Sequence, residues 1–302
     1  MKTWNKRNCP ICDMDTHSEI PEMASPKRAE NLSWEQVKDL FVGLREEQSF
    51  FSYYRCTNCG LLYCPWYFSD QQLEILYSEM PDNLMGEDKS VISKTQSGYV
   101  KWLSKRATAS NFMEIGPDIG LVSSAVDDTF DISESYLVEP NLAVHNQLSK
   151  SMPKALNVNV VEYLNQIATA NSDLVVGVHV YDHLLHPVKD LKELRSKSAS
   201  NSNLVIVVHN EKSRLRYLMK KAWVPFCLQH PQLYNPKTLG LLLEKSGWQL
   251  VEVNKSTNWY KARHFAEMGL GVLGLPKGLS RIFPSIEIPL KLGNMISISK
   301  AK

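Results

Sequence analysis

Four of the six cysteines in this sequence have a spacing that predicts metal chemistry, because they form two Cys-x-x-Cys pairs. Cys9 pairs with Cys12, and Cys56 pairs with Cys59. Two thiolates three positions apart converge on one ion when the turn between them is tight, so two such pairs predict a closed, structural, tetrahedral zinc site. We expect Gly60 to let the chain leave the second pair at positive φ.

Other interpretations of the cysteines are weaker. Two unrelated reduced pairs would share this spacing only by coincidence, and a thioredoxin-like redox pair is expected at a strand-to-helix junction. Cys64 and His17 could each replace a ligand, although Cys64 is expected to pack beside its aromatic neighbours, and Cys227 to be buried in an apolar stretch. Between the pairs, residues 33–47 have helical apolar spacing with Ser33 as the cap.

The composition predicts a globular, soluble, cytoplasmic protein. The chain has 302 residues, of which 43% are apolar, enough for one large domain and a smaller appendage. Its 34 basic and 32 acidic residues leave a net charge of +2, which disfavours a nucleic-acid partner. No apolar run approaches the roughly 20 residues that span a bilayer, and the first residues lack the apolar core of a signal peptide.

Apolar runs of strand length alternate with amphipathic helical stretches after residue 96, as in a parallel sheet covered on both faces. We expect strands at 111–115, 135–139, 156–161, 173–180, 203–209 and 248–254. Helices are expected at 119–127, 141–150, 162–169, 188–197 and 236–246. Asn235 and Pro236 mark the start of the last helix and Gly247 its end. The alternating residues 293–301 predict a seventh strand at or near the sheet edge.

A glycine turn follows the first of these strands, in the sequence FMEIGPDIG at 112–120. In open parallel sheets ligands bind outside the carboxyl ends of the strands, so Glu114 and this turn should face the binding crevice. Gly116 and Gly120 flank Asp118, which stands where a dinucleotide-binding loop would have glycine. The turn alone therefore leaves open whether it binds a nucleotide.

The end of the second strand carries a candidate ribose ligand. Glu139 lies 23 positions after Gly116, near the separation at which an acidic residue accepts hydrogen bonds from a ribose diol. The alternative is an acidic residue that stabilises a helix N-terminus next to Asn141. The pairing with the glycine turn favours the ribose ligand.

Together these residues resemble the class I S-adenosylmethionine-dependent methyltransferases that carry an N-terminal zinc-binding module, a group similar to the sugar C-methyltransferases. The resemblance covers nearly the whole chain and rests on CPIC, CTNCGLLY, SDQQLEILYSEM, EIGPDIG, LVEP, VYDHLLHPVKDLKEL and HPQLYNPKTLGLLLEKSGW. It implies an α/β, Rossmann-like, seven-stranded methyltransferase sheet whose last strand is antiparallel. We expect a zinc-binding module with a helical insertion at 1–68, a helical connector at 69–108 and the methyltransferase domain at 109–302.

The resemblance also implies two cofactors, S-adenosylmethionine and a structural zinc ion. The expected cofactor-binding residues are Glu114, Gly116, Pro117, Asp118, Gly120, Glu139, Asn141, Glu162 and His179. Glu162, or the backbone at Val161, takes the place of the adenine-facing aspartate that is usual after the third strand. His179 is expected to line the pocket. The Asp118 carboxylate either attracts the sulfonium or amino group of the cofactor or blocks the pocket.

His183 matches the position that lies by the reactive centre in sugar C-methyltransferases of this architecture. The family pattern there is Glu-His with a proline four positions on, whereas this chain has Asp182, His183 and Pro187. The imidazole could remove a proton from a hydroxyl or an acidic carbon, with Asp182 orienting it. The alternative is a hydrogen-bonded structural histidine.

Three further residues are weaker candidates. His230 and Tyr234 precede the last predicted helix and could orient the substrate, although their apolar segment could equally be a lid or a packed loop. Tyr77 matches a tyrosine that follows the zinc module in the family, and a core aromatic is the alternative.

We therefore expect a methyltransferase that acts on a small-molecule or sugar-linked acceptor, with His183 as general base. One alternative is an RNA methyltransferase whose zinc module holds RNA, favoured only by the basic stretch at 211–223. Another is a catalytically inactive, methyltransferase-like binding protein in which Asp118 has ended cofactor binding. A nicotinamide dehydrogenase would need the GxGxxG that this turn lacks. The sequence predicts neither the methylated atom nor the oligomeric state.

Overall fold

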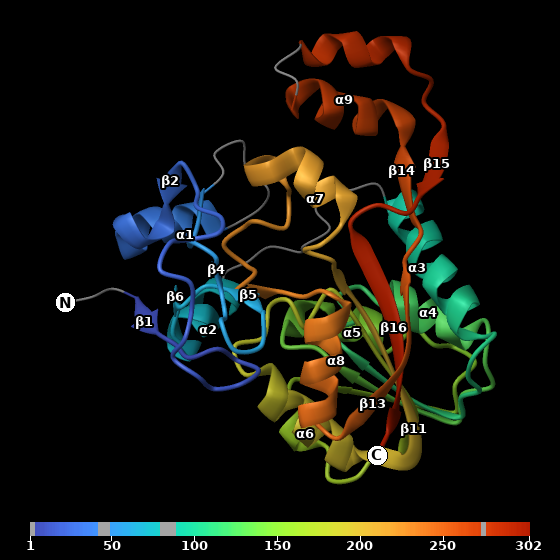
Figure 1. The fold of residues 1–302 in the computed structure, drawn as a ribbon. Helices are drawn as coiled ribbons and strands as arrows, with labels where there is room; N and C mark the ends of the chain where they lie inside the picture. The colour runs from blue at the N-terminus through green and yellow to red at the C-terminus, as the bar shows by residue number, and fades with distance from the viewer. Residues whose placement is uncertain (1–3, 42–48, 79–88, 273–275) are drawn as a thin grey trace.

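The computed structural model describes residues 4–41, 49–78, 89–272 and 276–302, and a seven-stranded sheet lies at its centre (Figure 1). The strand order is β13-β16-β11-β10-β7-β8-β9. The strands are β7 (Asn111–Ile115), β8 (Glu134–Val138), β9 (Asn157–Val161), β10 (Ser172–Val178), β11 (Ser198–His209), β13 (Trp248–Lys255) and β16 (Asn294–Ala301). β16 lies between β11 and β13 and is antiparallel to both, whereas the other strands run parallel. The predicted sheet with a reversed last strand is confirmed.

Helices cover both faces of this sheet because successive strand residues point to opposite sides. In β10, Leu174 and Val176 pack with one helical layer and Val175 with the other. The first layer contains α3 (Lys89–Leu103), α4 (Leu121–Asp127) and α5 (His145–Leu148). The second contains α6 (Pro187–Lys197), α8 (Pro236–Lys245) and part of the cysteine-rich region. Each fully buried aliphatic side chain contributes about 1.5–3 kcal/mol, so this double covering stabilises the sheet.

The N-terminal region consists of short elements (Figure 1). Their buried side chains form an aromatic core. These are β1 (Asn5–Lys6), β2 (Lys27–Arg28), η1 (Ala29–Asn31), α1 (Trp34–Phe41), β3 (Ser49–Phe50), β4 (Tyr54–Arg55), β5 (Leu62–Tyr63), β6 (Trp66–Tyr67) and α2 (Asp70–Ser78). Ser33 caps α1 as predicted, since its Oγ accepts the Gln36 N–H. The rest of the helix predicted at 33–47 lies outside the described residues.

A short strand ties this region to the sheet domain. β12 (Gln232–Leu233) pairs antiparallel with β5, so both regions share one small sheet. Arg55 of the N-terminal region also bonds Glu211, which follows β11, at 2.8 Å. Backbone and side-chain hydrogen bonds therefore connect the residues on the two sides of the boundary predicted at residue 68.

Two of the predicted helices are shorter than expected. Residues 162–169 contain only the 3-10 turn η3 (Leu164–Gln166), and 141–150 contain η2 (Leu142–Val144) followed by α5. In the first case the Gln166 side chain accepts the backbone N–H groups of Glu162 and Tyr163, at 2.8 and 3.0 Å. Local side-chain bonds of this kind compete with helical hydrogen bonds. The helix around Asn235 and Gly247 has the predicted ends, since Asn235 caps α8 and Gly247 has φ 83°.

An arm between β13 and β16 projects from the sheet (Figure 1). It consists of β14 (Asn258–Lys261), α9 (Ala262–Val272), η5 (Lys277–Ile282) and β15 (Glu287–Leu290), with β14 and β15 paired antiparallel. α7 (Arg214–Met219) and η4 (Lys220–Ala222) lie between β11 and β12. None of the helices in the described ranges is long and apolar enough to cross a membrane.

Candidate functional site

The four paired cysteines form one cluster, in which the Sγ atoms all lie within 4.8 Å of one another. Sγ of Cys9 is 3.4 Å from Sγ of Cys59, and Sγ of Cys12 is 3.5 Å from Sγ of Cys56. Four thiolates at about 2.3 Å from a tetrahedral ion would be about 3.8 Å apart, close to these separations. The hydrogen bond from the Cys9 thiol lowers the pKa of Cys59, which favours a thiolate at that position.

Two matching turns build the cluster. The N–H of Asp13 donates to the Cys9 carbonyl at 2.8 Å, and the N–H of Gly60 donates to the Cys56 carbonyl at 2.9 Å. Asp13 and Gly60 have φ 57° and 81°, so each turn closes through a left-handed residue. Gly60 has the predicted positive φ, and each pair presents its two thiols together because of this turn.

The remaining cysteines and His17 lie outside the cluster. The buried Cys64 lies in the aromatic core of the N-terminal region, and its Sγ is 3.5 Å from the Phe51 carbonyl oxygen. The His17 ring bonds the carbonyl of the next residue. Cys227 is only half-buried, and its Sγ lies 3.3 Å from Nδ1 of His230, a contact that its apolar neighbours in the sequence did not predict.

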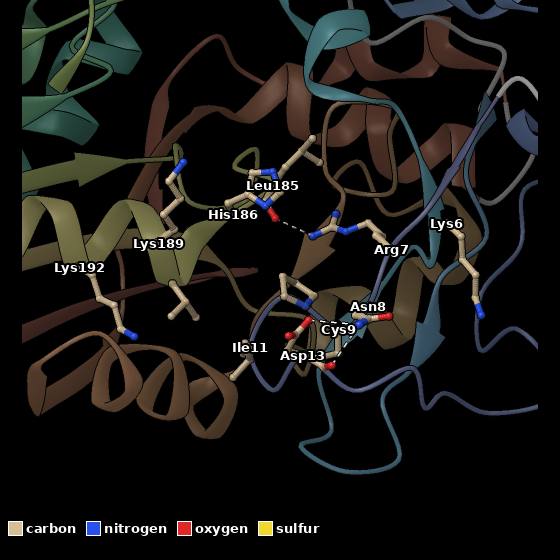
Figure 2. A pocket seen from close by; sticks show the side chains of 12 residues that line it. Lys6, Arg7, Asn8, Cys9, Ile11, Asp13, Leu185, His186, Lys189 and Lys192 are labelled. Carbon is tan, nitrogen blue, oxygen red and sulfur yellow. Dashed lines mark hydrogen bonds between the residues drawn. The ribbon is translucent and has the colours of Figure 1, made fainter. Parts of the chain in front are cut away.

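A cavity of about 770 Å³ lies between the first cysteine turn and the start of α6 (Figure 2). Its lining residues are Lys6, Arg7, Asn8, Cys9, Pro10, Ile11, Asp13, Leu185, His186, Val188, Lys189 and Lys192. The Arg7 guanidinium reaches across to the Leu185 carbonyl at 3.0 Å. None of the predicted cofactor-binding or catalytic residues lines this cavity.

The glycine turn after β7 has left-handed backbone at three alternate positions. Gly116, Asp118 and Gly120 have φ 64°, 52° and 81°. A Cβ atom on Gly116 would lie 2.6 Å from Cγ2 of Val180, and one on Gly120 would lie 2.8 Å from Cβ of Ser151. Glycine is therefore required at both ends of the turn. Asp118 adopts the backbone conformation of the glycine that it replaces, which aspartate tolerates better than most residues.

Two buried carboxyl groups flank this turn. The Oε atoms of Glu139 accept the backbone N–H groups of Asp118, at 3.0 Å, and Asn141, at 2.9 Å, which ties the turn to the end of β8. Glu114 is only 1% exposed and accepts a hydrogen bond from the Ser123 hydroxyl. Burial raises the pKa of Glu139, and it raises the pKa of Glu114 to about 8.

The other predicted cofactor residues lie along the same edge of the sheet. Pro117 is buried inside the turn. Glu162 follows β9 and is half-buried, with its backbone N–H bonded to Gln166. His179 follows β10 at φ 54°, and its N–H donates to the Val207 carbonyl at 2.8 Å. All of these positions follow the carboxyl ends of parallel strands, where ligands of open sheets bind.

Tyr77, His183 and His230 form a continuous hydrogen-bonded chain, which we call the histidine relay. The Tyr77 hydroxyl lies 3.1 Å from Nδ1 of His183, and Nε2 of His183 lies 3.2 Å from Nε2 of His230. Nδ1 of His230 lies 2.8 Å from the Pro225 carbonyl oxygen, which can only accept. The direction of the chain follows: His230 donates to Pro225, His183 donates to His230, and Tyr77 donates to His183.

Burial keeps this relay neutral. It holds the pKa of His183 well below its usual value and also lowers the pKa of His230, so both imidazoles are unprotonated bases at neutral pH. Tyr234, the other candidate in the segment before α8, is fully buried and donates to the Tyr181 carbonyl at 3.2 Å. Tyr234 therefore packs behind the relay.

Asp182 lies away from the His183 ring that it was expected to orient. Its Oδ2 accepts the backbone N–H of His209 at 3.1 Å, and the rings of His209 and His179 stack with centroids 4.6 Å apart. Burial raises the pKa of Asp182 to about 7 and lowers that of His179 to about 4. His209 and its partner Asn294 carried no predicted role. The sequence did contain an indication of a role for His209, because this residue ends the strand predicted at 203–209, where ligands of open sheets bind.

The residues that follow η4 in the segment between β11 and α8 pack against the N-terminal region. Trp223, Phe226 and Leu228 are buried in the aromatic core of the N-terminal region. Within the basic stretch at 211–223, the Arg216 guanidinium is buried and bonds Glu22 at 2.6 Å. This stretch therefore helps to hold the two regions together.

Comparison with known proteins identifies a shared fold. A family model described as a methyltransferase domain matches residues 92–253. The complex of the Haloferax volcanii Trm112 methyltransferase activator with a methyltransferase aligns at a TM-score of 0.52 and 12% identity, over 72% of this chain and 94% of that one. The N-methyltransferase NodS from Bradyrhizobium japonicum aligns at 0.48 and 11% identity, over 76% and 97%.

Other matches are more limited. The pyocyanin biosynthetic protein PhzM aligns at a TM-score of 0.48 and 14% identity over 70% of this chain, which spans only 55% of PhzM. No curated protein matches the sequence.

Proposed function

Because the chain belongs to the S-adenosylmethionine-dependent methyltransferases, we propose that it methylates a small-molecule or sugar-linked acceptor, whose proton passes to His183 through Tyr77. The observation that carries this proposal is the histidine relay beside the glycine turn. Val180 packs against Gly116, and the backbone N–H of His183 donates to the Val180 carbonyl at 2.9 Å. The predicted cofactor turn and the predicted base therefore meet through one residue.

The residues of the turn fit S-adenosylmethionine, which supplies an electrophilic methyl group on a positive sulfur. The close approach of Gly116 to Val180 leaves no room for a Cβ, as expected of a turn shaped to cradle a ligand. Each Glu139 oxygen accepts one backbone N–H and retains a lone pair, and these lone pairs suit the two hydroxyls of a ribose. Gly116 to Gly120 would hold the methionine part of the cofactor and Glu139 the ribose.

The relay suits an acceptor that must lose a proton. Both ring nitrogens of His183 already have hydrogen-bond partners, so a proton can reach this imidazole only through Tyr77. The Tyr77 hydroxyl would give its proton to His183 and take a proton from the acceptor hydroxyl or acidic carbon. Because burial disfavours the charged imidazole, the proton is held only transiently. General-base assistance of this kind contributes about 10²–10⁴-fold in rate.

We propose that the four-cysteine cluster binds zinc and braces this site. The Tyr53 hydroxyl donates to the His230 carbonyl at 2.6 Å, and the Cys64 N–H donates to the Pro231 carbonyl at 2.9 Å. A closed set of four thiolates has no open position for chemistry, so its ion would act on the reaction only by holding the segment that carries His230.

A two-step measurement tests the function. Calorimetry should first detect S-adenosylmethionine binding, and a labelled-methyl assay with free sugars, nucleotide-linked sugars and small phenols should then find one class of acceptor. Structured RNA serves as the competing substrate. Methylation of RNA alone, or no binding at millimolar cofactor, would contradict the proposal.

A further inference from the structure

A second group of potential metal ligands lies at the carboxyl edge of the sheet. His179 follows β10, Asp182 lies three positions later, and His209 is the last residue of β11. One nitrogen or oxygen atom from each lies within 4.8 Å of the corresponding atoms of the other two. Small side-chain adjustments would bring these atoms to the roughly 2.0–2.2 Å at which imidazole and carboxylate bind a transition metal.

Two buried atoms of this group have no hydrogen-bond partner. They are Oδ1 of Asp182, in a side chain with 0% exposure, and Nδ1 of His179. A buried polar atom without a partner costs about 1–3 kcal/mol, and more when it is charged. Such atoms call for an explanation, and an ion bound between them supplies one.

The surrounding residues already contact all three side chains, and the Asn294 Nδ2 lies 3.4 Å from Nε2 of His179. The Asn294 Oδ1 lies 2.8 Å from Nδ1 of His209, so it accepts the proton there and leaves Nε2 of His209 with its lone pair. The backbone N–H of His209 holds Oδ2 of Asp182 at 3.1 Å. Partners of this kind fix the tautomer and the direction of metal ligands. His209 and Asn294 are paired in the sheet register, which keeps this arrangement rigid.

We propose that His179, Asp182 and His209 bind one divalent first-row transition-metal ion at the carboxyl edge of the sheet. Two imidazoles and one carboxylate are a donor set that suits Fe²⁺, Mn²⁺, Co²⁺ or Zn²⁺. Three protein ligands leave positions open for a substrate oxygen, in contrast to the four cysteines. His179 and His209 are half-buried, whereas Asp182 is fully buried.

The ion would cooperate with the histidine relay. The ring centroids of His209 and His230 are 5.2 Å apart, which makes the proposed metal site and the relay neighbours. A bound cation lowers the pKa of a hydroxyl that coordinates it, and the relay would then take the released proton more easily. This role rests on the proposed methyl transfer, whereas the metal site itself does not.

Cobalt titration of protein produced with Co²⁺ in place of zinc tests the site, because Co²⁺ reports its ligands optically and the four-cysteine cluster stays filled. The four-cysteine cluster should give intense visible bands with a thiolate-to-metal charge-transfer band. Further Co²⁺ should give a second, weaker set of visible bands without charge transfer. We expect Asp182→Asn, which keeps the acceptor for the His209 N–H, and His209→Gln to remove the second set. His186→Gln, which changes an exposed histidine that caps α6, should retain both sets.

The outcome distinguishes this site from the methyltransferase function. A single set of bands with charge transfer in the unaltered protein, or a second set that survives both Asp182→Asn and His209→Gln, would overturn the metal site even if S-adenosylmethionine binds. A second set lost in both variants and kept in His186→Gln would support the site even if no cofactor binds. Circular dichroism of each variant establishes that lost bands reflect lost ligands in a folded chain.

Discussion

The four-cysteine cluster and the histidine relay are built in opposite ways. Each half of the cluster is one short turn, in which a left-handed residue closes a Cys-x-x-Cys pair. The relay joins side chains that are 106 and 47 positions apart along the chain. Local geometry therefore produces each half of the cluster. The completed fold brings the two halves together, since their thiols are 44 and 50 positions apart, and it alone produces the relay.

The two regions are nevertheless coupled. β5, directly after the second cysteine pair, forms a strand pair with β12, which directly follows the His230 segment. The Tyr67 hydroxyl also donates to the Leu228 carbonyl. Damage to the locally built cluster should therefore spread to the relay, whereas damage to the relay should stay within the site.

Loss of one cluster thiol should have the largest effect. We expect Cys56→Ser to abolish metal binding at the cluster and to lower the free energy of unfolding on the order of 5 kcal/mol, since the ion cross-links two turns. Metal analysis and thermal unfolding measure both effects. Cys64→Ala, at a buried cysteine outside the cluster, should keep the metal. Full metal content in Cys56→Ser would contradict the four-thiolate site.

The glycine turn is a second locally built feature and provides the next test. Gly116→Ala places a Cβ 2.6 Å from Val180 at φ 64°, which should cost about 1–3 kcal/mol of stability and weaken S-adenosylmethionine binding at least about tenfold. Calorimetry measures the affinity. The control is Gly98→Ala in α3, where no atom lies within 4 Å of the new Cβ, and it should leave the affinity unchanged. Equal affinity in both variants would exclude this turn from the cofactor site.

A relay variant should reduce activity without the stability loss of a cluster variant. We expect Tyr77→Phe to lower kcat about 10²-fold, because it removes the hydroxyl that donates to His183, while cofactor affinity stays the same. Tyr99→Phe is the matched control, since it removes a hydroxyl bonded to Asn258, outside the relay. An unchanged kcat in Tyr77→Phe would show that protons reach His183 by another route.

The pH dependence of stability tests the buried Glu114 carboxyl, which belongs to neither the cysteine cluster nor the histidine relay. Burial raises the pKa of Glu114 from 4.5 to about 8. Between these two values the native protein holds a proton that the unfolded chain has lost, so the free energy of unfolding falls as pH rises towards 8. Between about pH 5 and 8, Glu114→Gln should remove a slope of up to about 1.4 kcal/mol per pH unit. Denaturant unfolding across this range measures the difference, and parallel slopes would refute it.

The smallest effect is expected at Asp118. Asp118→Gly keeps the left-handed backbone, φ 52°, and the N–H that donates to Glu139, so stability should change by less than about 1 kcal/mol. Cofactor affinity should change by less than about threefold, or about 0.7 kcal/mol. A large loss of affinity, measured by calorimetry, would show that the Asp118 carboxylate itself contacts the cofactor.

Sequence patterns predicted the sheet well and the short connections poorly. The strands and the capped helix α8 follow from apolar periodicity and from Asn235, Pro236 and Gly247, which act within a few positions. The segment after β9 was predicted as helical, but the Gln166 side chain takes the N–H groups of Glu162 and Tyr163. The apolar periodicity of a sequence does not show whether a side chain will take the backbone N–H groups that a helix needs.

The two cysteine turns, the glycine turn and the parallel sheet follow from the amino-acid sequence, because tight turns and periodic strands depend on neighbours within a few positions. The partners of the polar side chains follow only from the folded chain. It placed Asp182 beside His209 rather than beside the His183 ring, and it joined His183 to Tyr77 and His230. Such contacts depend on how the ends of several strands and the N-terminal region pack together, which no local pattern encodes.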